Sequence, residues 1–200
     1  MNHFAMLTSA SAAGKTTDAV QIAAELGCGL LHNDEEIACR TFKALKHDEH
    51  CKYIGIPEKW SHLYDVADVD RLFRLHHRDW IARNPQHRMI LAEGWMYCLP
   101  QHRQQVYDGL RKLTDEWRFA LIRYFPPFEE RTRRYLKRHQ EPLVKLYGTD
   151  EGRKLAHAEE HLQKSIGYFT APGDDEPVVF ADLKTKDEVV AFLRRWIAAG

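Results

Sequence analysis

The chain has 200 residues, which suits a single domain with a full hydrophobic core. Hydrophobic residues make up 44% of it, and 29 lysines and arginines balance 29 aspartates and glutamates. This composition argues against a disordered chain, and no apolar run approaches the roughly eighteen residues of a membrane-spanning helix. The balanced charge also argues against a dedicated nucleic-acid-binding protein.

The amino-terminal segment carries only part of a secretory signal. Residues 4–13 are apolar or small, but no lysine or arginine precedes Lys15, and polar residues interrupt the apolar stretch. The four cysteines contain no C-x-x-C pair, so reduced thiols are expected. We therefore expect a cytoplasmic protein.

Short apolar runs alternate with helical periodicity, a pattern that predicts β-α units around a mostly parallel sheet. In the first half of the chain the pattern predicts a strand over 4–8, a helix over 15–26, a strand over 29–32 and a helix over 36–46. The stretch 47–68 is irregular and rich in polar and aromatic residues. We expect this stretch to form a cap rather than a layer of the sheet.

The second half continues the alternation. It predicts a helical stripe over 69–80, a strand over 88–93, a helix over 101–113, a strand over 118–125, a helix over 128–139, a largely helical stretch over 143–164, a strand over 178–181 and a helix over 186–198. His76 lies on the first of these apolar stripes, and we expect it to be a hydrogen-bonded core histidine. No linker is long enough to divide the chain, so 1–200 is predicted to be one domain.

A phosphate-binding motif lies between the first strand and the first helix. Residues 9–16 read S-A-S-A-A-G-K-T and match G-x-x-x-x-G-K-[ST] everywhere except at Ser9. Small residues let backbone N–H groups curl around a phosphate, Lys15 would reach the β- and γ-phosphates, and the Thr16 hydroxyl would bind Mg²⁺. The predicted ATP-contacting residues are Ser11, Ala12, Ala13, Gly14, Lys15, Thr16 and Thr17.

The motif and its surroundings resemble the nucleoside-monophosphate-kinase-like group of P-loop kinases, which includes shikimate kinase, adenylate kinase and chloramphenicol phosphotransferase. The resemblance implies a three-layer α/β/α domain with a five-stranded parallel sheet in the order 2-3-1-4-5, a lid and a substrate cap. The strand 178–181, followed by Asp182, is similar to the group's terminal strand, whose preceding loop touches adenine. No Asn-Lys-x-Asp guanine signature follows any later strand, which argues against a GTPase.

The resemblance implies a role for the acidic segment after the second strand. In this group an acid at the end of that strand faces the acceptor, and here Asp34 stands nineteen residues after Lys15. Ligands bind beyond the carboxyl ends of parallel strands, so Asp34 would position and deprotonate the attacking hydroxyl. Glu35 and Glu36 are the substitutes if the register differs. Alternatively, Asn33 and Asp34 only cap the next helix.

The third strand ends in a second acid. Residues 89–95 read M-I-L-A-E-G-W, which resembles the third strand of these kinases. The resemblance implies that Glu93 helps to organise Mg²⁺, in part through water, and that Gly94 allows close approach of the acceptor. Trp95 and Tyr97 would form a wall of the acceptor pocket, although aromatic residues after a strand are also ordinary packing residues.

The arginine-rich helix 128–139 is similar in position and composition to the lid of these kinases, where arginines close over the phosphates. Its spacing places Arg131, Arg134 and Arg138 on one face. Arg134 and Arg138 are the better candidates for stabilising the transferring phosphoryl group. The alternative is a solvated basic face.

The expected function is Mg²⁺-dependent transfer of the γ-phosphoryl group of ATP to a hydroxyl of a small molecule, by a monomer or a homodimer without nucleic-acid or membrane partners. Two alternatives stay open. A polynucleotide 5′-hydroxyl kinase shares the loop and the aspartate base but needs a basic track. A regulatory nucleotide-binding protein would hydrolyse ATP without an acceptor.

Two groups of side chains resemble metal sites. His157 and His161 fit the pattern H-x-x-E-H, for which a solvent-facing helix is the simpler interpretation. His47, His50 and Cys51 could share a helical face, but a closed zinc site needs a fourth ligand. We expect neither group to bind a metal.

Overall fold

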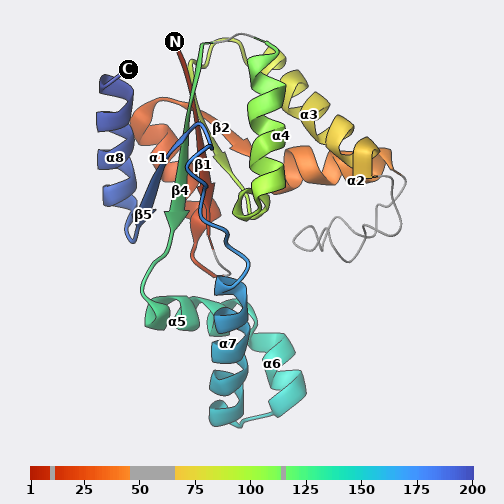
Figure 1. The fold of residues 1–200 in the computed structure, drawn as a ribbon. Helices are drawn as coiled ribbons and strands as arrows, with labels where there is room; N and C mark the ends of the chain where they lie inside the picture. Colours follow the sequence, from red (N-terminus) through yellow and green to blue (C-terminus); the bar gives the residue numbers. More distant parts are fainter. Residues whose placement is uncertain (10–11, 46–65, 114–115) are drawn as a thin grey trace.

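A five-stranded parallel sheet forms the centre of the structure (Figure 1). The computed structural model describes residues 1–9, 12–45, 66–113 and 116–200. The strands lie in the order β2-β3-β1-β4-β5, and each neighbouring pair is parallel, as predicted. They are β1 (Asn2–Thr8), β2 (Gly29–His32), β3 (Met89–Glu93), β4 (Trp117–Tyr124) and β5 (Val178–Leu183).

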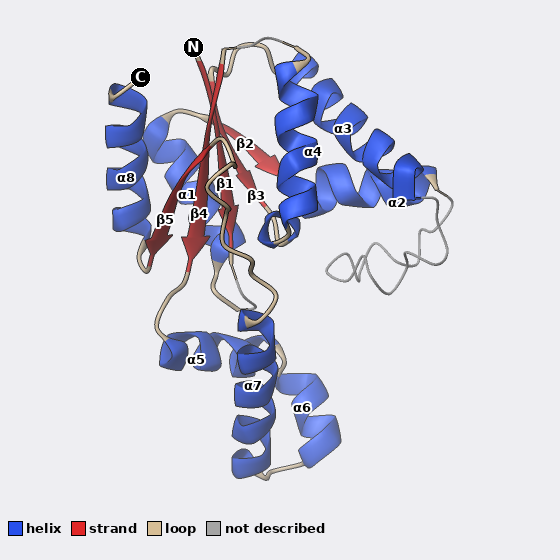
Figure 2. Cartoon of the chain, viewed as in Figure 1, coloured by secondary structure: helices blue, strands red, loops and turns tan. Residues whose placement is uncertain are grey.

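Helices cover both faces of the sheet (Figure 2). One face is covered by α1 (Lys15–Leu26) and α8 (Lys186–Ala198), and the other by α4 (Pro100–Arg111), which packs against α3 (Val66–Arg83). Two of these helices begin at residues that favour a helix N-terminus. Pro100 occupies the first turn of α4, and Thr185 forms a capping box with Glu188 at the start of α8. No helix in the described ranges is long and apolar enough to cross a membrane.

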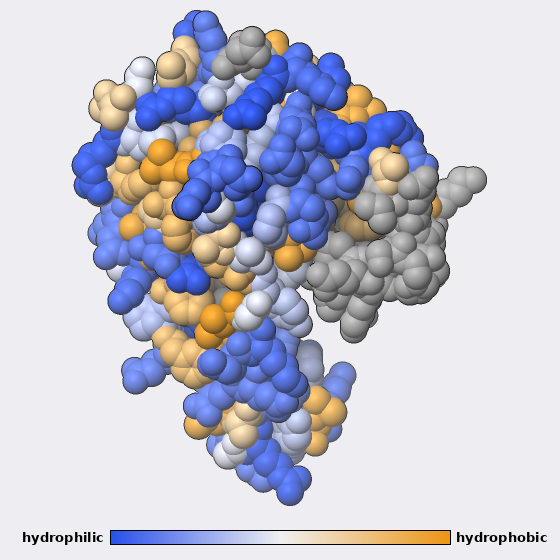
Figure 3. Space-filling model, viewed as in Figure 1, coloured by the Kyte–Doolittle hydropathy of each residue, from blue (hydrophilic) through white to orange (hydrophobic). Residues whose placement is uncertain are grey.

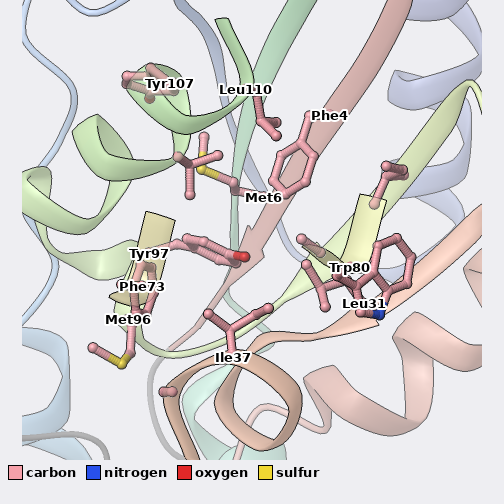
Figure 4. Packing of buried hydrophobic residues seen from close by; sticks show 14 of the residues in the cluster. Phe4, Met6, Leu31, Ile37, Phe73, Trp80, Met96, Tyr97, Tyr107 and Leu110 are labelled. Carbon is pink, nitrogen blue, oxygen red and sulfur yellow. The ribbon is translucent and has the colours of Figure 1, made fainter. Parts of the chain in front are cut away.

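Strand alternation divides the core into two clusters. On β1, Phe4 and Met6 belong to the cluster on the α3–α4 side, whereas Ala5 and Leu7 belong to the cluster beneath α1 and α8. Figure 4 shows the first cluster, with Phe4 and Met6 close to the labelled residues of α3 and α4. All four residues are completely buried, so β1 is covered on both faces. A continuous apolar sequence is typical of a central parallel strand that is buried in this way.

Three helices project from the carboxyl-terminal edge of the sheet: α5 (Phe128–Arg138), α6 (Gln140–Tyr147) and α7 (Glu151–Ile166). They share a small apolar cluster, built from Tyr135, Leu143, Ala158 and Leu162, against which Ala12 of the phosphate loop also packs. Their outer surface is mostly hydrophilic, whereas apolar surface gathers beside the sheet edge formed by β5 (Figure 3). The stretch 143–164 was predicted to be helical apart from Gly148 and Gly152. Gly148 does end α6, whereas Gly152 lies inside α7.

The segment after β2 differs from the prediction of a helix over 36–46. A π-helix, η1 (Asn33–Ala38), begins directly after β2 and is followed by α2 (Cys39–Ala44). Glu36 holds this start in place, because its Oε1 accepts from the His32 N–H at 3.1 Å and its Oε2 accepts from the Trp80 indole at 2.6 Å. The predicted acceptor cap lies largely outside the described residues, and its last residues, 66–68, belong to α3.

Two predictions about histidines need correction. The core histidine of α3 is His77, which is completely buried, with Nδ1 2.8 Å from the Phe73 carbonyl oxygen. His76 is half-buried, and neither of its ring nitrogens has a hydrogen-bond partner among the described residues. On α7, His161 is exposed as expected, but His157 is half-buried and its Nδ1 lies 3.0 Å from the Tyr147 hydroxyl.

Candidate active site

The segment between β1 and α1 has the backbone geometry of an anion-binding loop. Ala12 and Gly14 have positive φ angles of 59° and 78°, and α1 begins at the next residue, Lys15. Among the described residues, Ala12 is the one non-glycine residue with positive φ, a conformation that costs roughly 1–2 kcal/mol. Ser9 does not share it, so the first position of the motif needs no glycine-specific backbone.

The first turn of α1 is open to a ligand. No side chain of the described residues caps it, so its N–H groups remain available to an anion and the helix dipole favours negative charge there. A phosphate of a bound nucleotide would satisfy both. Of the residues predicted to contact ATP, Ser11 lies outside the described residues. The others all line one cavity: Ala12, Ala13, Gly14, Lys15, Thr16 and Thr17.

Lys15 and Thr16 meet the carboxylate that ends β3. The Lys15 ammonium forms an ion pair with Oε2 of Glu93, and Thr16 Oγ1 donates to the same oxygen at 3.3 Å. On the other side, Nδ1 of His32 lies 2.9 Å from Glu93 Oε1. The strand register explains this meeting, because Glu93 is paired with Leu7 of β1 and with His32 of β2.

Electrostatics keep Glu93 ionised. Burial acts to raise the pKa of this carboxyl, but the ion pair with Lys15 and the hydrogen bond with His32 outweigh burial and lower the pKa below its usual value. Carboxylate and hydroxyl oxygens are ligands that Mg²⁺ prefers. Glu93 and Thr16 therefore form a donor set that fits the metal of a bound metal–nucleotide complex.

Asp34 lies in the first turn of η1, at the carboxyl end of β2. Both carboxylate oxygens accept from the Trp95 backbone N–H, at 3.1 and 3.0 Å. Burial raises the pKa of Asp34, and the positive charge of Lys15 and the hydrogen bond from Trp95 offset only part of that shift. A carboxyl with a raised pKa at the end of a strand is a candidate general base.

Gly94 makes room for this acid. A Cβ at position 94 would lie 2.8 Å from Cβ of Asn33 and 2.9 Å from Oδ1 of Asp34. Asn33 is completely buried here. The end of β2 thus packs directly onto the turn after β3, which fixes where the Asp34 carboxylate stands.

The arginines of α5 occupy different environments. Arg131 is completely buried, with its guanidinium 4.5 Å from the ring centroid of Phe125. Arg134 reaches the phosphate loop, where it donates to the Ala13 carbonyl oxygen and lies against Gly14. Arg138 is exposed and lines the cavity. The shared face predicted from the spacing therefore contains one structural arginine and two that face the site.

A cavity of about 740 Å³ brings most of the predicted residues together, whereas Glu93 and Gly94 are not among the residues that line it. Its wall is formed by Ser9, by the described loop and helix residues from Ala12 to Asp18, and by Asp34, Glu35, Trp95, Arg134 and Arg138. Tyr97 is not part of the wall: it is completely buried, with its hydroxyl 3.3 Å from Nε2 of His77.

Sequence reasoning missed two polar residues of the site. His32 was not singled out, although it ends the second strand as Glu93 ends the third, and adjacent parallel strands bring such residues together. Asp18 lies one turn into α1, accepts from the Tyr124 hydroxyl at 2.7 Å and lies 3.9 Å from Arg134. No motif marks Asp18, because its partners come from β4 and α5.

Comparison with known proteins adds the fold family. No family model and no curated protein matches the sequence. In structure, the chain is similar to a gluconokinase from Sinorhizobium meliloti 1021, with a TM-score of 0.54 and 12% sequence identity over 98% of this chain and 93% of that chain. It is also similar to a sugar kinase from Janibacter sp. HTCC2649, with a TM-score of 0.52 and 18% identity over 99% and 95% of the two chains.

The chain has a P-loop kinase fold. Its parallel sheet in the order 2-3-1-4-5 is the arrangement expected of the nucleoside-monophosphate-kinase-like group, and the fold is shared with small-molecule kinases. At these identities the likeness shows the fold alone, so the chemistry of this chain depends on its own residues.

Proposed function

We propose that the protein transfers the γ-phosphoryl group of ATP to a hydroxyl of a small molecule. One observation carries the proposal: an uncapped helix N-terminus with Lys15 and Thr16 shares a cavity with Asp34, whose pKa is raised. Such a pairing provides a phosphate site and a proton acceptor on the same cavity wall.

The loop supplies the phosphate site. Its left-handed residues Ala12 and Gly14 turn successive backbone N–H groups inward, and the first turn of α1 adds its own. Lys15 stands at the first position of the helix and contributes the positive charge that the β- and γ-phosphates require. Thr16 and Glu93 would hold Mg²⁺, which when bound neutralises charge on the phosphates.

Asp34 supplies the proton acceptor. Its carboxylate takes the proton of the acceptor hydroxyl, the oxygen attacks the γ-phosphorus, and the bond to the bridging oxygen breaks to release ADP. The two hydrogen bonds from the Trp95 N–H hold the carboxylate in one orientation. A group held in place in this way has little orientational freedom left to lose in the transition state.

Arg134 and Arg138 supply charge from the α5 side. Arg134 contacts the loop through the Ala13 carbonyl and is paired with Glu130 on its own helix. Arg138 lies one turn further along and lines the same cavity. Both can approach a transferring phosphoryl group by a small movement of the projecting helices, which is how lids act in phosphoryl transfer.

The size of the cavity supports a small acceptor. At about 740 Å³ it falls within the roughly 300–1,000 Å³ that small-molecule sites occupy, and the nucleotide phosphates take part of this space. The wall beside Asp34 is formed by Glu35 and Trp95. This is a restricted space with a few polar contacts rather than a basic track for a polynucleotide.

The proposal is tested by ADP release with a panel of sugars, polyols, hydroxy acids and nucleosides, together with calorimetry of Mg²⁺·ATP binding. We expect acceptor-dependent ADP release, and Lys15→Ala should abolish it and weaken Mg²⁺·ATP binding while the protein still folds, with some loss of thermal stability because the nearly buried Glu93 loses its ion pair. Lys43→Ala, at the end of α2, is the matched control. Equal Mg²⁺·ATP affinity in Lys15→Ala would contradict the loop assignment.

The same assay separates the alternatives. ADP release that no acceptor increases would favour a regulatory ATPase. Labelling of an oligonucleotide 5′-hydroxyl, with binding that weakens steeply as salt rises, would favour a polynucleotide kinase.

A further inference from the structure

His32 ends β2 beside the residue that ends β3. The parallel register pairs His32 directly with Glu93, so both side chains leave the sheet on the side where α1 begins. The imidazole Nδ1 lies 2.9 Å from Glu93 Oε1. The Glu93 side chain is 5% exposed and that of His32 is 28% exposed. Neither residue lines the cavity, but Lys15 and Thr16, which contact Glu93, do.

The two oxygens of Glu93 have separate partners. Oε2 is held by Lys15 and Thr16, whereas Oε1 is held by His32. A carboxylate paired with a lysine is ionised and only accepts hydrogen bonds, so Nδ1 of His32 carries the hydrogen. The bond is therefore an Nδ1–H donation from His32 to Oε1.

Lys15, which holds Oε2 of Glu93, would bind the phosphates of ATP in the proposed function. When the phosphates of ATP fill the loop, the ammonium of Lys15 turns toward them. A carboxylate held on that side alone would rotate freely about its last torsion, which has a broad energy profile. The bond from His32 does not involve the nucleotide and keeps this rotation restricted.

We infer that His32 is a positioning residue, which holds the Glu93 carboxylate in the orientation that receives the metal ion of the metal–nucleotide complex. The inference rests on the proposed function and names a residue that the phosphate-loop motif does not contain. Partners that orient a metal-binding carboxylate typically contribute about 10–100-fold to metal affinity.

The contact can be changed with little effect on the fold. The anchoring of η1 uses the backbone N–H of His32 with Glu36, not the imidazole. Asparagine places an amide N–H close to the position of Nδ1, so His32→Asn keeps a donor, whereas His32→Ala removes it. At the other end of β2, His87 packs against Gly29 in a similar partly exposed setting, and His87→Asn is the matched control.

Calorimetry of ATP binding with excess Mg²⁺ and with EDTA tests the inference. We expect His32→Ala to lose about 10–100-fold of the affinity that Mg²⁺ adds, with unchanged affinity in EDTA. His32→Asn should regain most of the loss, and His87→Asn should behave as the parent protein. The half-saturating Mg²⁺ concentration for ADP release should rise by a similar factor in His32→Ala.

Several outcomes would overturn the inference. If His32→Ala lost equal ATP affinity with Mg²⁺ and with EDTA, His32 would affect the phosphate loop in general and not the metal ion. If His32→Asn lost as much Mg²⁺-dependent ATP affinity as His32→Ala, the hydrogen bond to Glu93 would not be the cause of the loss. If the parent protein gains no ATP affinity from Mg²⁺, the proposed function fails as well, whereas a gain in His32→Ala as large as that of the parent overturns the inference alone and leaves that function standing.

Discussion

Replacing Gly94 with alanine tests the packing that positions the candidate base. A Cβ at this position would lie 2.8 Å from Asn33 Cβ, 2.9 Å from Asn33 Nδ2 and 2.9 Å from Asp34 Oδ1. Carbon atoms in contact prefer about 3.5–4.0 Å, so the end of β2 would have to move by roughly half an ångström or more. Asn33 is completely buried, which leaves it little space to move.

Overpacking of this kind costs about 1–3 kcal/mol of unfolding free energy. The same movement displaces the Asp34 carboxylate from the Trp95 N–H, and a catalytic group misplaced by about 1 Å loses roughly 100-fold in rate. We therefore expect Gly94→Ala to lower both stability and turnover, with little change in Mg²⁺·ATP affinity, because the phosphate loop is untouched.

The matched control is Gly109→Ala, inside α4. A Cβ there would meet its nearest atoms, all of Arg74, at 3.6 to 3.8 Å, which is ordinary contact. Alanine is a better helix former than glycine by about 1 kcal/mol, so this variant should be equally stable or more stable, and fully active. Urea unfolding followed by tryptophan fluorescence, with ADP release, measures both. If Gly94→Ala matches Gly109→Ala in stability and rate, the reasoning is refuted.

Further predictions use paired variants. Asp34→Asn should lower acceptor-dependent ADP release by about 100-fold or more while ATP binding persists, as measured by calorimetry. Because burial raises the pKa of Asp34, kcat of the parent should fall on the acid side at a pH above the ordinary aspartate value of 3.8, and the asparagine variant should lack that limb. Arg134→Glu should lower turnover more than Arg133→Glu, since Arg133 is exposed; equal rates would assign α5 a purely structural role. Arg103→Ala should cost about 3–5 kcal/mol in urea unfolding, because its buried guanidinium pairs with Glu176 at 2.5 Å and binds three carbonyl oxygens, whereas breaking the exposed Arg71–Asp68 pair should cost under about 1 kcal/mol.

The order of the strands was implied by the resemblance to P-loop kinases, whereas the place of the site followed from local sequence patterns. The phosphate-loop motif stands between a strand and a helix, and Asp34 and Glu93 follow apolar runs. Parallel strands bring their carboxyl ends to one edge, so residues far apart in the chain could be placed in one site before any contact was known. The contacts of Lys15 with Glu93 confirm that these strand ends meet.

Predictions failed where a tertiary contact decides the outcome. Arg131 has the helical spacing of a lid arginine, yet it packs on the aromatic ring of Phe125, and spacing alone does not reveal that ring. His76 and His77 are neighbours on α3 and point about 100° apart around the helix axis. Which of the two faces the core depends on how the helix is rotated about its axis, and the packing of α3 against the sheet sets that rotation. Tyr97 was assigned to the pocket wall because it follows a strand, but the short turn after Trp95 directs it inward.

Departures from favourable local structure gather around one cavity. Ala12 holds a left-handed backbone, α1 begins without a side-chain cap, β2 runs directly into a π-helix, and burial raises the pKa of Asp34. Each of these features destabilises the isolated segment, and the remaining fold has to offset the cost. A phosphate in the loop would cap α1, and a proton received from an acceptor would neutralise Asp34. The same ligands therefore relieve the strain at these positions, which is the relation expected between a preorganised site and its substrates.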